Sequence, residues 1–172
     1  MSNDMDKYTG AANVGVDELK ALPEQVVAEL EAHKQLYLTD PEKAHYWDPG
    51  VIGVPGGPVA CLLLEYTGRK SGKKLSMAIQ YYRRNGKVAI VASKGGIEEN
   101  PQWYLNLQAD PNCYVRIGAK SSPAVARTAT GAERAEWWAQ IREEQPMQKT
   151  YESRTSREIP VVILEFPEGT DI

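Results

Sequence analysis

Several residue types that define whole classes of protein are scarce in this chain of 172 residues. It has two cysteines and two histidines, too few for the ligand clusters of transition-metal sites. Its apolar runs have the length of strands, well short of the roughly 20 residues that a membrane-spanning helix needs. The segment Met1–Gly10 is polar and carries Asp4 and Asp6, which argues against a secretory signal. We therefore expect a cytoplasmic protein without a transition metal.

The overall charge argues against a nucleic-acid-binding protein. The net charge is −3 and 42% of the residues are hydrophobic, as in an ordinary globular domain. Nothing in this charge balance indicates nucleic acid as the main partner.

Cys61 and Cys113 are far apart and lie in apolar, strand-like runs, so we expect reduced thiols rather than a disulfide.

The composition divides the chain into an extension at 1–58 and a strand-rich remainder at 59–172. In the extension, apolar spacing predicts a helix from Pro23, and the proline- and glycine-rich stretch 39–58 is typical of an irregular connection. The remainder lacks the regular strand–helix alternation and the Gly-x-Gly-x-x-Gly spacing of a doubly wound nucleotide fold. We predict strands at 61–67, 75–84, 87–93, 113–118, 124–130 and 159–166, a hairpin at Asn85-Gly86, and helices at 101–109, after an Asn100 cap, and at 132–142.

A basic turn at Gly68–Gly72 is the first segment that suggests chemistry. Its two glycines let the backbone fold back, so that consecutive N–H groups line a concave surface. Arg69, Lys70 and Ser71 add charged and neutral donors, and two more lysines follow directly. Such a cluster on an acidic protein suits a phosphate or a carboxylate. Taken alone, a solvated hairpin turn is the more common explanation.

Two later segments are weaker signals. Ser93–Gly96 follows a predicted buried strand and places a hydroxyl and an ammonium group at the edge of the sheet, although a glycine pair there is usually a simple turn. In the helix predicted at 101–109, Trp103 and Leu107 share a face, more often a core face than a ligand face. Asn106 either reaches the same neighbourhood or is a solvent-exposed amide.

In this order and spacing, the segments resemble the F420-dependent nitroreductase/quinone reductase family, and within it the branch with the mycobacterial nitroimidazole-activating enzyme. The motifs are Thr-Gly-Arg-Lys-Ser-Gly from Thr67, Ala-Ser-x-Gly-Gly from Ala92, Pro-x-Trp-Tyr-x-Asn-Leu from Pro101, and Thr-x-Arg-x-Ile-Pro from Thr155. The resemblance covers roughly 60–167. It implies an α+β fold, a split β-barrel of about six mainly antiparallel strands with inserted helices. The extension 1–58 would pack on or over this barrel.

The resemblance also implies a cofactor and an activity. A reduced deazaflavin, coenzyme F420H2, would transfer a hydride from its C5 to a quinone, enone or related planar acceptor. Ser93 would face the deazaflavin ring, and Tyr151 would donate a proton or orient the acceptor, so these two residues are the catalytic candidates. Tyr151 is equally compatible with an interfacial tyrosine. The cofactor-binding positions that carry over are Arg69, Lys70, Ser71, Gly72, Ser93, Lys94, Gly95, Trp103 and Asn106.

The chain departs from that branch on the acceptor side. Gln80 stands where the branch often has an aromatic residue, and Leu75 where it often has a basic one. Met147 and Gln148 occupy the turn before Tyr151, where a second tyrosine is common. Cofactor binding is compatible with these changes, whereas nitroimidazole activation becomes doubtful.

Two alternatives remain open at this stage. The first is a non-catalytic carrier of F420 or another planar ligand, since no acid or base in the sequence compels turnover. The second is an FMN-dependent split-barrel oxidoreductase, although the single phosphate of FMN needs fewer cations than the basic cluster offers. The sequence also leaves open a monomer or a homodimer, weak association with a membrane surface, and a role of the extension as a lid.

Overall fold

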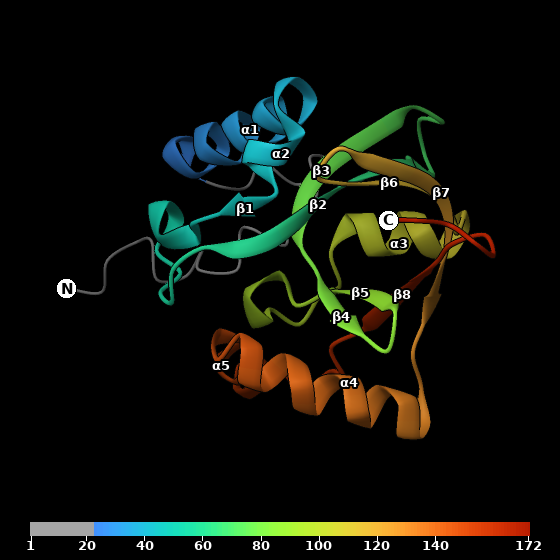
Figure 1. The fold of residues 1–172 in the computed structure, drawn as a ribbon. Helices are drawn as coiled ribbons and strands as arrows, with labels where there is room; N and C mark the ends of the chain where they lie inside the picture. Colours follow the sequence, from blue (N-terminus) through green and yellow to red (C-terminus); the bar gives the residue numbers. More distant parts are fainter. Residues whose placement is uncertain (1–22) are drawn as a thin grey trace.

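The computed structural model describes residues 23–172, which form one curled antiparallel sheet with helices on both sides (Figure 1). The strand order is β1-β2-β6-β7-β8-β5-β4, and β3 pairs with β2 outside this path. The strands are β1 (Tyr46–Trp47), β2 (Val59–Thr67), β3 (Lys74–Gln80), β4 (Tyr82–Arg84), β5 (Lys87–Val91), β6 (Asn112–Ile117), β7 (Lys120–Thr128) and β8 (Val161–Glu165). The helices are α1 (Glu24–Thr39), α2 (Pro41–Ala44), α3 (Gln102–Ala109), α4 (Gly131–Glu144) and α5 (Met147–Ser153), with short 3-10 turns η4 (Pro49–Ile52) and η5 (Lys94–Gly96).

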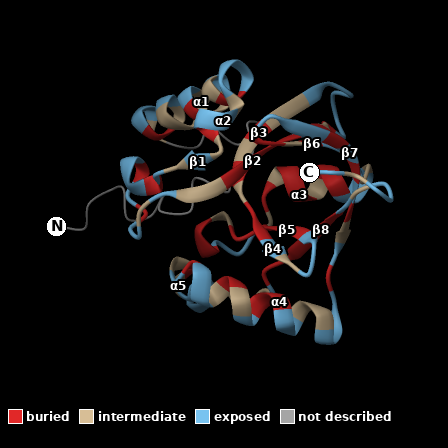
Figure 2. Cartoon of the chain, viewed as in Figure 1, coloured by how far each residue is buried: buried red, intermediate tan, exposed pale blue. Residues whose placement is uncertain are grey.

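The sheet curls around α3, so that the main core lies inside a half-barrel (Figures 1 and 2). Leu62 and Leu64 of β2 face this core together with the fully buried Trp103 of α3. Leu63 points to the other face of β2, where it packs against Tyr37 of α1. Because β2 is covered on both faces, its sequence is a continuous apolar run rather than an alternating one. The predicted antiparallel split barrel is confirmed.

A second core lies between the sheet and the helices α4 and α5. Trp137 and Ile141 of α4 are almost fully buried there, against Val161 and Ile163 of β8. The helix predicted at 132–142 is confirmed, and Ala135 lies on its exposed side. Helix α5, which begins directly after Pro146, was not predicted from the sequence.

The extension is joined to the barrel by hydrogen bonds as well as by apolar packing. Helix α1 begins after Pro23, as predicted. The buried hydroxyl of Tyr37 donates to the Cys61 carbonyl at 2.8 Å and accepts from the Gly118 N–H at 2.9 Å. Its pKa is raised to about 12, chiefly because burial disfavours the phenolate. The boundary at residue 58 stays a prediction, and the part before residue 23 lies outside the described residues.

The stretch 39–58 is more ordered than predicted. Asp40 caps the short helix α2 by accepting from the Lys43 N–H, and Pro41 occupies its first turn. After it, β1 pairs with the start of β2, Tyr46 opposite Ala60. The prediction of an irregular connection was therefore wrong, because local capping creates short elements that the proline content conceals.

Other boundaries also differ from the predictions. The strand predicted at 75–84 breaks at Tyr81, whose N–H bonds the Ala60 carbonyl, so β3 pairs with β2 and β4 with β5. The Asn85-Gly86 hairpin is confirmed, with φ of 51° and 75° at its two residues. Strand β7 begins at Lys120 and runs through Pro123, which is tolerated because β8 pairs with β7 only from Val125 onward.

Three general features of residues 23–172 bear on function. No helix in this part of the chain combines the length and apolarity needed to cross a membrane. Over the same residues, no cluster of three or more histidine, cysteine, aspartate or glutamate side chains is arranged to hold a metal ion. Both cysteines are unpaired, and burial raises the pKa of the Cys61 thiol far above its usual value, so this side chain is an unreactive core residue.

Candidate functional site

The basic turn connects β2 to β3 as a closed loop. The Gly72 N–H bonds the Gly68 carbonyl at 2.9 Å, and the Gly68 N–H bonds the Lys73 carbonyl at 2.8 Å. Gly72 has a φ of 69°, and a Cβ placed on Gly68 would lie 2.8 Å from the Ser71 hydroxyl. The two glycines suit this turn for different reasons, the first because it lets the Ser71 hydroxyl approach closely and the second because it adopts a left-handed conformation.

Asn106 holds this turn against α3. Its side-chain oxygen accepts from the Arg69 backbone N–H at 3.0 Å and from the Arg69 guanidinium at 2.8 Å. A second bond joins that guanidinium to the Gln102 side-chain oxygen at 2.6 Å. Asn106 is 2% exposed, so the interpretation as a solvent-exposed amide is wrong. The asparagine fixes the turn from behind and leaves the outer side of the loop open.

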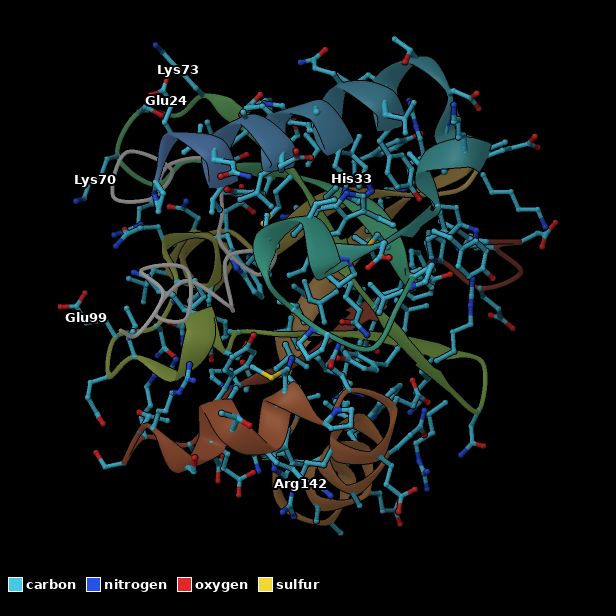
Figure 3. The ribbon with its side chains drawn as sticks, turned by 90° about the vertical axis from the view of Figure 1, so that its left-hand side faces the viewer. Glu24, His33, Lys70, Lys73, Glu99 and Arg142 are labelled. Carbon is cyan, nitrogen blue, oxygen red and sulfur yellow. The ribbon has the colours of Figure 1, made fainter. Side chains whose placement is uncertain are left out.

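The outer side of the turn carries unpaired positive charge. Lys70 and Lys73 point away from the body of the protein (Figure 3). Neither these lysines nor Arg69 makes an ion pair with any residue in the described range 23–172. The hydrogen bonds of the same residues also leave the backbone N–H groups of Lys70 and Ser71 without a partner. This donor set, charged side chains beside free amides, fits a phosphodiester or a carboxylate ligand.

The second loop, Ser93–Gly96, follows β5 and has an unusual backbone. Lys94, Gly95 and Gly96 have φ values of 45°, 66° and 81°, so three consecutive residues adopt the left-handed conformation. A lysine in this conformation is strained and persists only where the surroundings hold it. Ser93 itself is fully buried.

Arg157 provides much of that support. Its guanidinium and Nε donate to the carbonyls of Ala92, Ser93 and Ile97 and to the side-chain oxygen of Asn100, at distances of 2.8 to 3.2 Å. Because the Asn100 oxygen is used in this way, it does not cap α3 as predicted, and Pro101 occupies the N-cap position without a side-chain bond. Burial lowers the pKa of Arg157 from its ordinary value.

The same loop also packs directly against α5. A Cβ placed on Gly96 would lie 2.3 Å from the Tyr151 carbonyl oxygen, so only glycine fits there. Gly96 thus brings Tyr151 next to the Ser93–Gly96 loop, across more than 50 residues of sequence. The backbone contact gives a physical reason for Tyr151 and the Ser93–Gly96 loop to lie side by side.

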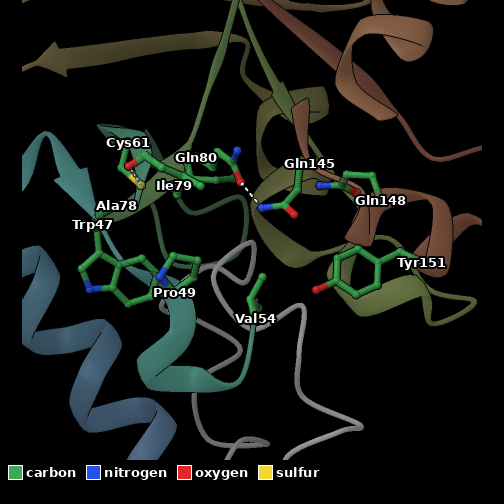
Figure 4. Close-up of a pocket in the computed structure, with 11 residues that line it drawn as sticks. Trp47, Pro49, Val54, Cys61, Ala78, Ile79, Gln80, Gln145, Gln148 and Tyr151 are labelled. Carbon is green, nitrogen blue, oxygen red and sulfur yellow. Dashed lines mark hydrogen bonds between the residues drawn. The ribbon is translucent and has the colours of Figure 1, made fainter. Parts of the chain in front are cut away.

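Tyr151 also lines a pocket between the extension, β3 and the α4–α5 junction (Figure 4). In Figure 4 the Tyr151 hydroxyl points into this space. The pocket has a free volume of about 20 Å³. Its other lining residues are Trp47, Pro49, Val54, Val59, Cys61, Ala78, Ile79, Gln80, Gln145 and Gln148.

The structure therefore groups the residues predicted from the sequence into two places. Arg69, Lys70, Ser71 and Gly72 form the basic turn, with Asn106 behind it. The remaining loop positions, Ser93, Lys94 and Gly95, adjoin Tyr151. Trp103 lies in the barrel core, as the packing interpretation expects, and its contact with a cofactor stays a prediction. The support that Arg157 gives to the Ser93–Gly96 loop was not predicted, although Arg157 is part of the Thr-x-Arg-x-Ile-Pro motif.

Comparison with known proteins identifies the family. Residues 48–166 match the model of the F420H(2)-dependent quinone reductase family, more than half of the chain. The chain belongs to this family. An F420H(2)-dependent quinone reductase of Mycobacterium tuberculosis is 38% identical over 120 residues, which cover 67% of this chain and 80% of that protein.

Two solved structures agree with this assignment. One is described as an F420-H2 dependent reductase and is 42% identical, with a TM-score of 0.57 over 61% of this chain and 93% of that chain. The other is described as a domain-swapped dimer and is 35% identical, with a TM-score of 0.59 over 78% of this chain and 95% of that chain.

Membership of the F420H(2)-dependent quinone reductase family confirms the resemblance found in the sequence. It also confirms an F420H2-dependent reductase with coenzyme F420 as cofactor, and it favours this activity over the FMN-dependent and non-catalytic alternatives. The basic turn fits the cofactor independently, because its donors suit the phosphodiester and carboxylates of the F420 side chain.

Proposed function

We propose that this chain reduces a quinone with F420H2, and that the reaction takes place where the Ser93–Gly96 loop meets Tyr151. The observation that carries the proposal is the contact of Gly96 with the Tyr151 backbone. Tyr151 therefore contacts a loop that matches the family's cofactor motif and also lines a pocket. A cofactor and an acceptor can then approach each other without a large rearrangement of the barrel.

We assign the cofactor-binding residues to two groups. Arg69, Lys70, Ser71 and Gly72 bind the phosphate and the acidic tail, because their donors are exposed and unneutralised. Ser93, Lys94 and Gly95 border the ring, where the rigid backbone fixes its orientation. Asn106 acts by positioning Arg69, and Trp103 supports the ring side from α3.

Bound F420H2 supplies the hydride, and the protein supplies position and a proton. The Tyr151 hydroxyl points into the pocket (Figure 4), where it can donate to an oxygen of the acceptor or hold that oxygen in place. The ring of Tyr151 packs in the second core, and the Arg154 guanidinium lies 5.8 Å from its centroid. These contacts restrict the direction of the hydroxyl. The buried surroundings keep water away from the site.

The test is a titration followed by a turnover assay. F420 fluorescence is followed as the protein is added, with FMN as the competing ligand, and F420H2 oxidation is then measured with a panel of quinones and enones. We expect tight F420 binding and oxidation above the protein-free rate with at least one quinone. Tight FMN binding with weak F420 binding would overturn the cofactor assignment. F420 binding without turnover on any acceptor would indicate the carrier instead.

Assembly and cellular placement are coarser proposals. A relative is described as a domain-swapped dimer, so we propose that this chain also forms a homodimer, which light scattering of the purified protein tests. The cytoplasmic placement and the weak contact with a membrane surface expected from the sequence stay predictions. Flotation with lipid vesicles tests the membrane contact.

A further inference from the structure

Three glutamine side chains gather along one side of the pocket (Figure 4). Gln80 ends β3, Gln145 follows α4, and Gln148 lies in α5. Gln145 and Gln148 are 6% and 1% exposed, an unusual degree of burial for this residue type. We call these three residues the amide wall. The opposite side of the pocket is apolar, with Trp47 and Val54 among its residues.

The pocket contains no formal charge among its described lining residues. None of them is a lysine, arginine, histidine, aspartate or glutamate. A charged ligand would lose its hydration there without gaining a counter-charge, which is strongly unfavourable. The lining therefore selects an uncharged ligand with an apolar body and a few oxygen atoms.

The hydrogen bonds of the amide wall are incomplete. The Gln145 amide N–H donates to the Gln80 side-chain oxygen at 3.3 Å, a long bond. The Gln148 side-chain oxygen is buried and has no partner, and the same is true of the Tyr82 hydroxyl. Burial raises the pKa of Tyr82, and the nearby Gln148 side chain partly offsets this increase. No hydrogen bond of ordinary geometry joins the two side chains. A buried polar atom without a partner is rare in folded proteins and marks a place for a ligand or a water.

We propose that the amide wall recognises the oxygen atoms of an uncharged quinone and of the hydroquinone formed from it. This inference rests on the proposed function. Each amide has both a donor and an acceptor, so its N–H bonds a quinone carbonyl and its C=O bonds a hydroquinone hydroxyl. In the overall reaction F420H2 and the quinone become oxidised F420 and the hydroquinone, as one hydride and one proton are transferred. The same three side chains thus bind the substrate and the product without a change of charge.

The free volume of the pocket shows how the acceptor enters. About 20 Å³ holds a single water molecule and no ring. The Gln145–Gln80 bond joins the end of α4 to the end of β3 along one side of the pocket, and it breaks when an acceptor binds both amides. Because the acceptor oxygens then bond both amides, the protein exchanges one long hydrogen bond for new ones. The amide wall closes the pocket when it is empty and binds the acceptor when it is open.

The experiment replaces the amides by a side chain of similar shape. Gln80→Met and Gln148→Met are compared with Gln35→Met, a matched control on the exposed side of α1. Two readouts are used: KM and kcat with menadione in the F420-loaded protein, and menadione binding to the F420-free protein, followed by quenching of tryptophan fluorescence. We expect KM and the dissociation constant to rise about five- to tenfold in each pocket variant. The control, kcat and the affinity for F420 should change little. Menadione sulfonate, which is anionic, should bind the unaltered protein at least about tenfold more weakly than menadione.

Each other result contradicts a named part of the proposal. Unchanged menadione binding in both pocket variants overturns recognition by the amide wall, and equal binding of the sulfonate overturns selection for neutral ligands. A loss of F420 affinity of the same size assigns the amides to the cofactor instead. If the unaltered protein does not bind F420, the proposed function fails. The menadione measurement on F420-free protein then still decides whether the amide wall binds quinones.

Discussion

The two glycine-rich loops of the site differ in exposure, in charge and in backbone conformation. The basic turn Gly68–Gly72 is exposed, positively charged on its outer side, and held from behind by Asn106. The loop Ser93–Gly96 is largely buried, adopts a strained backbone, and is fixed by Arg157 and Tyr151. In the proposed function, the first offers positive charge to the flexible side chain of F420, and the second offers a fixed surface to its ring.

This difference predicts how each loop responds to change. Charge acts over several ångströms and tolerates small displacements, but salt screens it. A packed backbone tolerates almost no displacement, and salt affects it little. Substitutions in the basic turn should therefore alter affinity gradually, whereas those in the Ser93–Gly96 loop should disrupt the site.

The largest expected effect comes from one extra methyl group. Gly96→Ala places a Cβ against the Tyr151 carbonyl at a φ of +81°, so we expect a loss of about 2–5 kcal/mol in the free energy of unfolding. F420 binding should fall below detection. Gly72→Ala is the matched control, because its φ is +69° and nothing lies within 4 Å of the added Cβ. Its cost should be only about 1–2 kcal/mol. Equal melting temperatures for the two variants would contradict the comparison.

Arg157→Lys should have the second largest effect. Lysine keeps the charge, but a single ammonium group does not reach three carbonyls and the Asn100 oxygen together. We expect about 2–4 kcal/mol lower stability and at least about tenfold weaker F420 binding. Hydrogen exchange of the amides at 93–97 should accelerate in the protein without cofactor. Arg83→Lys, an exposed site, serves as the control. Retained affinity and slow exchange would show that the loop holds its shape without Arg157.

Lys70→Ala should weaken F420 binding more modestly, and in a way that depends on salt. The side chain is exposed and makes no ion pair within the described residues, so the melting temperature should not change. We expect about two- to fivefold weaker binding at low salt and almost none of this difference at high salt. Titrations of both proteins with F420 at several salt concentrations measure this difference in affinity. A defect that is independent of salt would mean that Lys70 contributes shape rather than charge.

The smallest expected effect concerns Glu98, at the edge of the Ser93–Gly96 loop. Its carboxylate accepts from the N–H and the hydroxyl of Ser156, both at 2.8 Å, and the bond from the N–H chiefly lowers its pKa. A carboxyl with a lowered pKa stabilises the fold above its usual pKa of about 4.3, and this stabilisation is lost as the pH falls further. Glu98→Gln should therefore lower the melting temperature slightly at neutral pH and not at all in acid. A difference that persists in acid would exclude the charge as its cause.

Local signals in the sequence were sufficient for much of the fold. The Asn85-Gly86 turn, the start of α1 at Pro23 and the apolar run of β2 all reflect preferences of a few neighbouring residues. The break at Tyr81 was not predictable in the same way, because it arises from a partner strand far away in the sequence. Helix α5 was missed because it has only 7 residues, too few for a clear helical periodicity, and the packing of Gln148 and Tyr151 stabilises it.

The candidate site shows the same limit. Arg69 and Ser93 could be named from the sequence because their motifs occur in the order and spacing typical of the family. The residues that hold those loops, Asn106 and Arg157, act through bonds to segments 37 or more positions away. No periodicity reveals such a bond. Gln80 and Gln148 were recognised as departures from the family, but only the pocket shows that they face the same space.

Through the hydroxyl of Tyr37, the barrel depends on its extension for two hydrogen bonds. The family match begins at residue 48, so this tyrosine lies outside the matched residues. Yet it completes the hydrogen bonds of Cys61 and Gly118, which lie within the matched part. Strand β2, which contains Cys61, ends at the basic turn. Shortening the chain to residues 48–166 would therefore leave two backbone groups of the barrel without partners.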